Sequence, residues 1–231
     1  AGRQFQSVVY AGHFSWGEFH WKLRQFHKAL WTREDAAASV IHPPPFSCLV
    51  SIRDTVERVW SCVNYRYSTN FTAMSSLEFR NFLVTALDLY GFGCNNELTR
   101  ILSGFKDELT LNRMSSDVHL EALSSQLAQR AIDNGRHCVI LATSFSELET
   151  IRVLKHFYPW LTDVTAIPRE NTRTKKYHDH LKLTGALDKS TKPPTRFVDV
   201  IQEVNAADMA VERALRHRAN SILSLVKEAS P

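Results

Sequence analysis

Two short apolar segments, each followed directly by a helical pattern, constrain the fold of this chain most. The first covers Phe46 to Ile52 and leads into a helix predicted from about Thr55 to Tyr67. The second covers His137 to Ala142 and leads into a helix predicted from Ser146 to Phe157. Consecutive apolar residues are typical of strands buried on both faces of a parallel sheet. Strands alternating with helices therefore predict an α/β fold, in which helices flank a parallel β-sheet.

The same reading predicts further elements along the chain. They are a strand at Gln6–Tyr10, helices at Trp16–Trp31, Leu77–Leu89 and Leu120–Ile132, an irregular segment opened by Gly91 and Gly93, a basic loop at Asn171–Pro194 and mostly helix over Thr195–Val226. Gly135 is expected just past the end of the third of these helices. At 231 residues and 44% hydrophobic, the chain is long enough for a substantial core, and we expect one domain over residues 1–231.

Charge and composition narrow the class of partner. The formal net charge is only +4, and the basic residues are spread out except for a cluster between Arg169 and Lys192. This pattern favours a local anionic partner over a nucleic-acid surface. No uninterrupted apolar run approaches the ~18 residues that a membrane span requires. The four cysteines have no CxxC spacing and no obvious disulfide framework, so the redox compartment stays open.

Polar residues follow two of the predicted strands at the point where each strand ends. His13 comes shortly after the first strand, and Arg53 comes directly after Ile52. Ligands of open parallel α/β sheets bind beyond the carboxyl ends of the strands, so both side chains are expected to face one crevice. A guanidinium in that position suits a phosphate, because its planar fork donates two parallel hydrogen bonds.

The start of the next helix is predicted from a capping-box pattern. Asp54 is a good N-cap, and Glu57 stands three residues later. Ser61 lies on the same helix face as Asp54, about 10 Å further along at 1.5 Å per residue. One anion cannot sit at the helix tip and also touch Ser61. A shared phosphate must therefore lie along the side of the helix, with Arg53 reaching toward it.

These residues resemble a known family. "IRDTVERVWSCVNYRY" is similar to the 3′-phosphate-binding segment of the membrane-associated carbohydrate sulfotransferases, which have an apolar strand, Arg-Asp-Pro, two or three residues, Arg and then Ser. "VVYAGHFSWGEF", "NNELTRILSG" and "VILATSFSELETIRVLKHFYPWL" resemble successive segments of the heparan sulfate and uronyl 2-O-sulfotransferase branch. The resemblance implies a sulfotransferase-like fold related to the P-loop NTPases, and it covers most of the chain in the right order.

The resemblance also implies a chemistry. Arg53 and Ser61 would hold the 3′-phosphate of 3′-phosphoadenosine 5′-phosphosulfate (PAPS), and His13 would be the catalytic base for sulfuryl transfer to a carbohydrate hydroxyl. Arg173, Lys175 and Lys176 lie in a basic stretch that is similar to the family's closing loop, and they would contact either the donor or an anionic glycan acceptor. The scheme requires no metal. The family's compartment is the Golgi lumen.

Two departures from the family pattern set limits on that reading. Thr55 stands where the family has proline, which is a tolerable change because proline at a first helical position only presets φ. The family's strand and Lys-rich loop for the 5′-phosphosulfate should precede Ala1, and the sequence does not contain them. Either that part lies outside the sequence, or another chain supplies it, or the fold serves without catalysis.

Each site residue also has a structural interpretation. Arg53 would be a surface arginine paired with Asp54 or Glu57, His13 a buried hydrogen-bonded histidine, and Ser61 a small packing residue. Lys175 and Lys176 would belong to a solvated loop. On this interpretation the protein is a non-catalytic sulfotransferase-fold subunit of a larger protein assembly, in an organelle or the cytosol.

Overall fold

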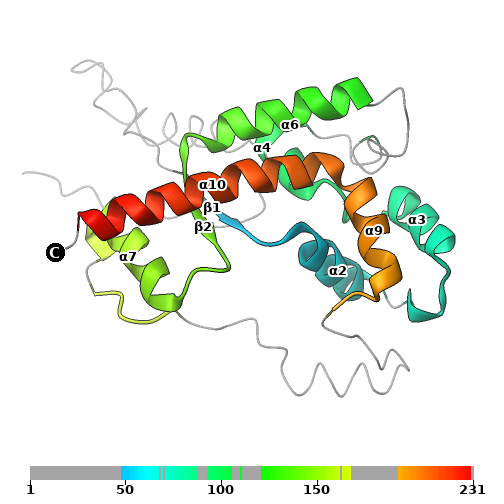
Figure 1. The fold of residues 1–231 in the computed structure, drawn as a ribbon, viewed down its shortest axis with the longest axis horizontal. Helices are drawn as coiled ribbons and strands as arrows, with labels where there is room; N and C mark the ends of the chain where they lie inside the picture. The colour runs from blue at the N-terminus through cyan, green and yellow to red at the C-terminus, as the bar shows by residue number, and fades with distance from the viewer. Residues whose placement is uncertain are drawn as a thin grey trace, which may run out of the picture.

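The structure, a computed structural model, describes residues 48–67, 69, 71–87, 93–105, 110, 121–161, 163–167 and 192–229. The predicted strand and helix before residue 48, with His13, lie outside these residues, and so do Arg173, Lys175 and Lys176. The described part is mostly helical around a small parallel sheet, which is an α/β arrangement (Figure 1).

The sheet has two described strands, β1 (Cys48–Ile52) and β2 (Cys138–Ala142). They pair in parallel, with Cys48 opposite Cys138 and Ile52 opposite Ala142. The strand β2 is buried along nearly its whole length, as the apolar pattern predicts. The prediction is wrong for β1, which alternates: Ile52 is buried, whereas Leu49 is 47% exposed and Ser51 is exposed. One face of β1 therefore packs on the core and the other faces outward.

A helix follows each strand, at the predicted place. The helix α2 (Thr55–Arg66) begins after Asp54, whose Oδ1 accepts a hydrogen bond from the Glu57 backbone N–H at 3.0 Å. The helix α7 (Glu147–Phe157) begins after Ser146, which forms a complete capping box with Glu149. These local caps satisfy backbone donors that no helical carbonyl can reach, and this is why both starting points were predictable.

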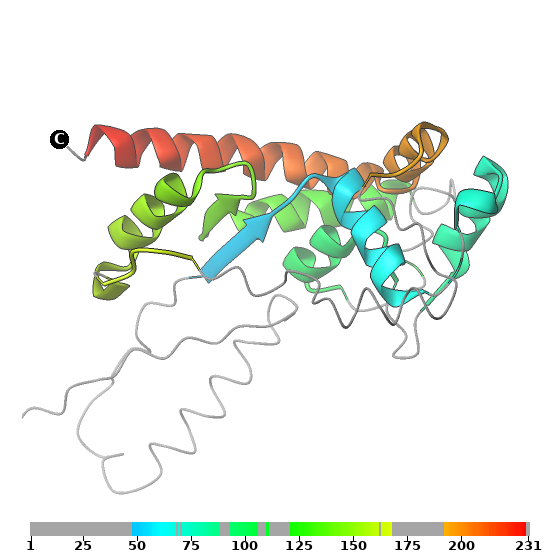
Figure 2. The same cartoon turned by 90° about the horizontal axis from the view of Figure 1, so that it is seen from below.

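The long helix α10 (Ala206–Glu228) organises the rest of the molecule. Figure 2 shows it running along most of the described structure, with the sheet, α6 (Glu121–Gly135) and α4 (Glu97–Ser103) on one side of it. The prediction of helix over Thr195–Val226 is correct except for a break between α9 (Thr195–Val204) and α10. At the break, the Ile201 carbonyl accepts both the Asn205 backbone N–H at 3.0 Å and the Asn205 side-chain amide at 2.9 Å, a local side-chain bond of a kind that often accompanies bends in helices.

Two other predictions along this part of the chain need correction. Gly135 is the last residue of α6 and does not lie beyond its end. A Cβ at Gly135 would lie 2.6 Å from Leu215 Cδ2, so the glycine permits α6 to approach α10 closely. The segment predicted to be irregular after Gly93 contains α4, whose ends have left-handed backbone at Asn96 (φ 51°) and Gly104 (φ 74°).

The buried side chains form two clusters. The first lies between the sheet and helices α4, α6, α7 and α10, with Ile140, Val153 and Leu215 among its least exposed members. The second joins α2, α9 and α3 (Ser76–Thr85) through aromatic rings, and Phe79 and Phe197 stack with their centroids 4.1 Å apart. Two short 3-10 helices, Phe71–Ala73 and Pro159–Leu161, complete the described elements. The helix α3 ends four residues before the predicted Leu89.

All four cysteines form disulfides, although no disulfide framework was predicted. Cys48 and Cys138 join the paired strands, with their Cα atoms 4.6 Å apart, and Cys62 and Cys94 join α2 to the segment before α4, with Cα atoms 5.7 Å apart. The partners are 90 and 32 residues apart in sequence, so spacing alone did not reveal them. Among the helices of the described residues, none has the length and apolar character needed to cross a membrane.

Candidate functional site

Two of the six predicted site residues belong to the described structure, and both lie on or beside α2. Arg53 directly follows β1 at the carboxyl edge of the sheet, as predicted, and its side chain is 42% exposed. Ser61 is half-buried in the second turn of α2, one helical turn beyond Glu57 on the same face. Arg53, Glu57 and Ser61 therefore follow one side of the helix start.

The tip of α2 is already filled by carboxylates of the protein itself. Glu212 of α10 accepts hydrogen bonds at 2.7 Å from both the backbone N–H and the hydroxyl of Thr55. Asp54 accepts the Glu57 N–H. Helix N-termini attract anions, but here the N–H groups of Thr55 and Glu57 already donate to carboxylates of the protein. An external phosphate at α2 is thus restricted to the side of the helix, where the sequence reasoning expected it.

The same contact gives Thr55 a structural role that proline could not perform. Proline has no backbone N–H and no hydroxyl, so it would remove both donors to Glu212. Glu212 is a buried residue, and a buried carboxylate requires such partners. The threonine at this position therefore has a specific partner on α10.

Arg53 forms the ion pair that the structural interpretation anticipates. Its Nε donates to Glu57 Oε2 at 3.1 Å, and the Glu57 side chain is 51% exposed. The capping-box prediction is thus half correct: Asp54 caps the helix, but the Glu57 carboxylate contacts Arg53. An exposed i,i+4 pair contributes about 0.3–0.5 kcal/mol. A phosphate could displace Glu57 from the guanidinium at little cost.

The other strand end has polar partners that the sequence reasoning missed. Arg216 donates through Nε and Nη2 to Glu212 Oε1, at 3.2 and 2.5 Å, and its Nη1 lies 3.4 Å from the Ser144 hydroxyl. Ser144 stands two residues past β2. The i,i+4 spacing of Glu212 and Arg216 in a helical pattern was a readable signal for the pair itself. Nothing in the sequence indicated that the pair would lie at the sheet edge.

The pKa of Glu212 reflects two opposed effects. Burial, the largest single effect, raises the pKa of this carboxyl group. Hydrogen bonds from Thr55 and Arg216 stabilise the ionised form and together outweigh burial, so the pKa is lower than usual. Glu212 is thus an anion near neutral pH and is a structural counter-ion for Arg216 and the start of α2.

A second buried polar cluster connects α10 to α4. Asp208 is fully buried and accepts from the Thr99 N–H at 2.7 Å, the Thr99 hydroxyl at 2.6 Å and the Leu98 N–H at 3.0 Å. Arg58 of α2 pairs with both Asp208 and Glu97. Asp208 therefore serves as the N-terminal cap of α4 from another helix.

The "NNELTRILSG" segment belongs to this buried region. Asn95 and Asn96 are 1% and 0% exposed. Asn205 accepts from the Asn96 N–H at 2.8 Å and donates to Asn95 Oδ1 at 3.0 Å. These contacts give the segment a structural role at the junction of α4, α9 and α10.

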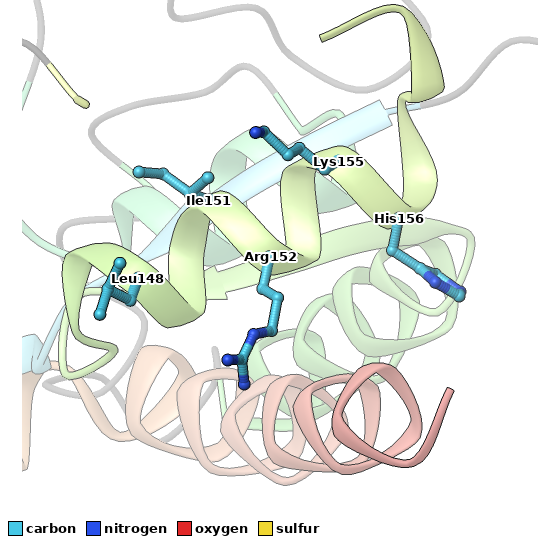
Figure 3. Close-up of a pocket in the computed structure, with 5 residues that line it drawn as sticks. All are labelled: Leu148, Ile151, Arg152, Lys155 and His156. Atoms are coloured by element: carbon cyan, nitrogen blue, oxygen red, sulfur yellow. The ribbon is translucent and has the colours of Figure 1, made fainter. Parts of the chain in front are cut away.

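An open hollow of about 450 Å³ lies along α7, away from the predicted site residues. It is lined by Leu148, Ile151, Arg152, Lys155 and His156. In Figure 3, Arg152 and Lys155 extend to opposite sides of the helix, so their cationic groups do not converge on one point. Within the described residues, no group of three or more His, Cys, Asp or Glu side chains is arranged to hold a metal ion.

The contact between α7 and the end of α10 predicts an acid-sensitive interaction. Lys227 donates to Glu149 at 2.8 Å, and this bond, with bonds from the backbone and side chain of Ser146, lowers the pKa of Glu149 from 4.5 to about 2. Because the folded-state pKa is depressed, the stabilisation is present above pH 4.5 and is lost as the pH falls toward 2. We expect Lys227→Met to make the acid-induced loss of stability shallower in this range. Urea unfolding midpoints over this pH range measure the effect.

Lys155→Met is the matched control for that experiment. Lys155 lies on α7, as Glu149 does. Its replacement removes the same charge as Lys227→Met but leaves Lys227, the partner of Glu149, in place. Its pH dependence should match that of the wild type. Equal pH slopes for Lys227→Met and the wild type would contradict the assigned role of the Glu149–Lys227 pair.

Comparison with known proteins adds no further constraint on this site. No protein-family model, no curated protein and no solved structure matches the chain.

Proposed function

We propose that this chain is a sulfotransferase-like protein whose α2 side holds the 3′-phosphate of PAPS. The observation that supports this most is Arg53, an exposed guanidinium at the carboxyl end of a parallel strand, which forms a surface ion pair with Glu57. Ser61 adds a hydroxyl donor on the same helix face. A planar fork and a hydroxyl are a donor set that fits a phosphate. The carboxylates at the helix tip favour binding along the side.

The chemical roles in this proposal follow the family resemblance. When bound, PAPS supplies the sulfuryl group for transfer to a carbohydrate hydroxyl. His13 accepts the proton of that hydroxyl, because a neutral imidazole ionises near working pH. Arg173, Lys175 and Lys176 neutralise negative charge on the donor or on an anionic glycan. These four residues lie outside the described part of the structure.

The two disulfides support an oxidising compartment for the protein. Disulfides form and persist in secretory and extracellular environments and are rare in the cytosol. Both pairs join separate elements of the described fold. A lumenal location, such as the Golgi lumen, is therefore part of the proposal.

Binding of adenosine 3′,5′-bisphosphate tests the proposal directly. We expect micromolar binding by the wild type and a loss of about 10- to 100-fold in Arg53→Ala, because a charge-assisted pair contributes about 1.5–3 kcal/mol. Glu57→Gln should tighten binding by about two- to fivefold, because it removes a competing carboxylate from Arg53. Isothermal titration calorimetry at fixed salt measures both changes.

Arg136→Ala is the matched control for Arg53→Ala. Arg136 is an exposed arginine in an i,i+3 pair with Asp133 at 3.4 Å, at the end of α6. Its replacement should leave binding unchanged. Absence of binding by the intact natural protein would overturn the proposal.

The alternative is a non-catalytic sulfotransferase-fold subunit of a larger assembly. The exposed face of β1 favours it, because Leu49 within this strand is 47% exposed and offers an apolar contact to another protein. In that case neither the wild type nor Glu57→Gln would bind the bisphosphate.

A further inference from the structure

One edge of the Arg216 guanidinium is held by the protein, while the side chain as a whole is partly exposed. Its Nε and Nη2 both donate to the same oxygen of Glu212. Glu212 is itself buried and receives two more hydrogen bonds from Thr55, so its position is determined by two elements of the fold. The guanidinium is therefore oriented before any ligand arrives.

The second edge of the Arg216 guanidinium can donate further hydrogen bonds. A guanidinium carries five N–H donors, and Nη1 and Nη2 together form the end-on edge that binds oxyanions in a bidentate manner. Among the described residues, Nη1 makes one contact, a long one of 3.4 Å to the Ser144 hydroxyl, and the Arg216 side chain is 33% exposed. The exposed edge and the serine hydroxyl are both suited to an anion.

The position of this edge in the fold is where ligands of parallel sheets bind. Ser144 follows β2 by two residues, and the Thr143 N–H donates to the Ile52 carbonyl at 2.9 Å, which holds the two strand ends together. Arg53 follows Ile52 on the neighbouring strand. Arg216 therefore brings a second cation from α10 to the edge that carries Arg53.

In the described part of the chain, five carboxylates near this edge have partners within the protein. Glu212 receives hydrogen bonds from Thr55 and Arg216, Glu57 pairs with Arg53, and Glu149 pairs with Lys227. Asp54 accepts the Glu57 N–H, and Glu147 accepts the Ile167 N–H at 2.8 Å. These carboxylates thus accept hydrogen bonds from the protein itself, and none of these contacts uses Arg216 Nη1.

We propose that Arg216 Nη1 and the Ser144 hydroxyl form an oxyanion-binding site at the end of β2, which takes a phosphate, sulfate or carboxylate group. The group can come from the second phosphate of the bisphosphate nucleotide or from an anionic glycan. The site uses different atoms from the proposed Arg53–Ser61 phosphate site. Experiments can therefore support or overturn the Arg216–Ser144 site independently of the Arg53–Ser61 site.

The main test is Ser144→Asp, which places a carboxylate of the protein opposite Arg216 Nη1. Ser144 is exposed, so the fold should tolerate the change. The probes are adenosine 3′,5′-bisphosphate, adenosine 3′-phosphate and a sulfated hexasaccharide, each titrated by calorimetry. We expect a loss of about tenfold or more for the probe whose oxyanion occupies the site. Thr143→Asp adds the same charge one residue away and should change binding about twofold or less.

Arg216→Lys is the second variant, because lysine keeps the charge near Glu212 but has no second edge. It should reduce binding of the same probe by a similar factor. Its matched control is Arg218→Lys on the same helix, where Arg218 Nε lies 3.4 Å from the Cys138 carbonyl, at the amino end of β2. That control should bind every probe as the wild type does.

The outcomes separate the two sources of the anion and the two proposals. A loss for the bisphosphate but not for the 3′-phosphate supports the site with the nucleotide's second phosphate in it. A loss for the hexasaccharide alone supports the site with a glycan in it, even where the nucleotide fails to bind and the PAPS proposal falls. Unchanged binding of all probes in Ser144→Asp, equal losses in Thr143→Asp, or no probe bound by the wild type would overturn the Arg216 site. After either of the first two results, the Arg53–Ser61 phosphate site would still be supported if Arg53→Ala loses nucleotide binding.

Discussion

Asp208→Ala is expected to lower the free energy of unfolding by about 3–5 kcal/mol. Asp208 is fully buried, accepts three hydrogen bonds from Leu98 and Thr99, and pairs with Arg58. Its removal leaves the N–H groups of Leu98 and Thr99 without their cap and takes one of two carboxylate partners from the largely buried Arg58 guanidinium, which keeps Glu97. Urea unfolding followed by circular dichroism measures the loss.

Four further variants define the cause of that loss: Asp208→Asn, Asp199→Ala, Arg58→Met and Arg58→Met combined with Asp208→Ala. Asp208→Asn keeps the shape and one acceptor, and it should cost less than the alanine variant. Asp199→Ala removes an exposed carboxylate from α9 and should stay within about 0.5 kcal/mol of the wild type. If Arg58 and Asp208 are coupled, Arg58→Met combined with Asp208→Ala should cost less than the sum of the two single changes. Additive losses would contradict the coupling.

Loss of the Cys48–Cys138 disulfide is expected to be the other large effect. The partners are 90 residues apart, and closure of a loop of that length stabilises the folded state by about 4–5 kcal/mol in the chain-entropy treatment. For Cys62 and Cys94, which are 32 residues apart, the same treatment gives about 3–4 kcal/mol. We expect Cys48→Ser with Cys138→Ser to lower the thermal unfolding midpoint more than Cys62→Ser with Cys94→Ser.

Reduction provides the control for the disulfide prediction. Dithiothreitol should destabilise the wild type but have no further effect on a variant that lacks all four cysteines. Mass spectrometry of the alkylated, unreduced protein should find no free thiol, in agreement with both disulfides. Detection of free Cys48 or Cys138 in the oxidised protein would contradict the assigned pairing.

The helices that follow the strands were predictable because their signals are local. Asp54 and Ser146 stand where a capping residue satisfies N–H groups of the next turn, and this interaction spans only three residues. The strand β2 was predictable because a run of apolar residues is hard to place anywhere except in a core. The position of Arg53 at the carboxyl edge follows from these same local signals.

The missed features depend on which elements meet in space. A glycine near a helix end was expected to lie just past the helix, but Gly135 is the last residue of α6, where Leu215 of α10 leaves no room for a Cβ. The left-handed Asn96 and the helix break at Asn205 occur together because the two side chains bond to each other's segments. The outward face of β1 was missed because an apolar run does not reveal how many of its faces are covered.

The sequence alone determined where α2 starts, that Arg53 precedes it, and that a phosphate reaching Ser61 must lie along the helix side. Those conclusions require only local capping and the geometry of a helix. The tertiary structure decided that Glu212 fills the helix tip, that Glu57 pairs with Arg53, and that Arg216 reaches the end of β2. Thr55 and Glu212 are 157 residues apart, and Ser144 and Arg216 are 72 apart. Contacts across such separations exist only after the chain has packed, since no local pattern selects one distant partner over another.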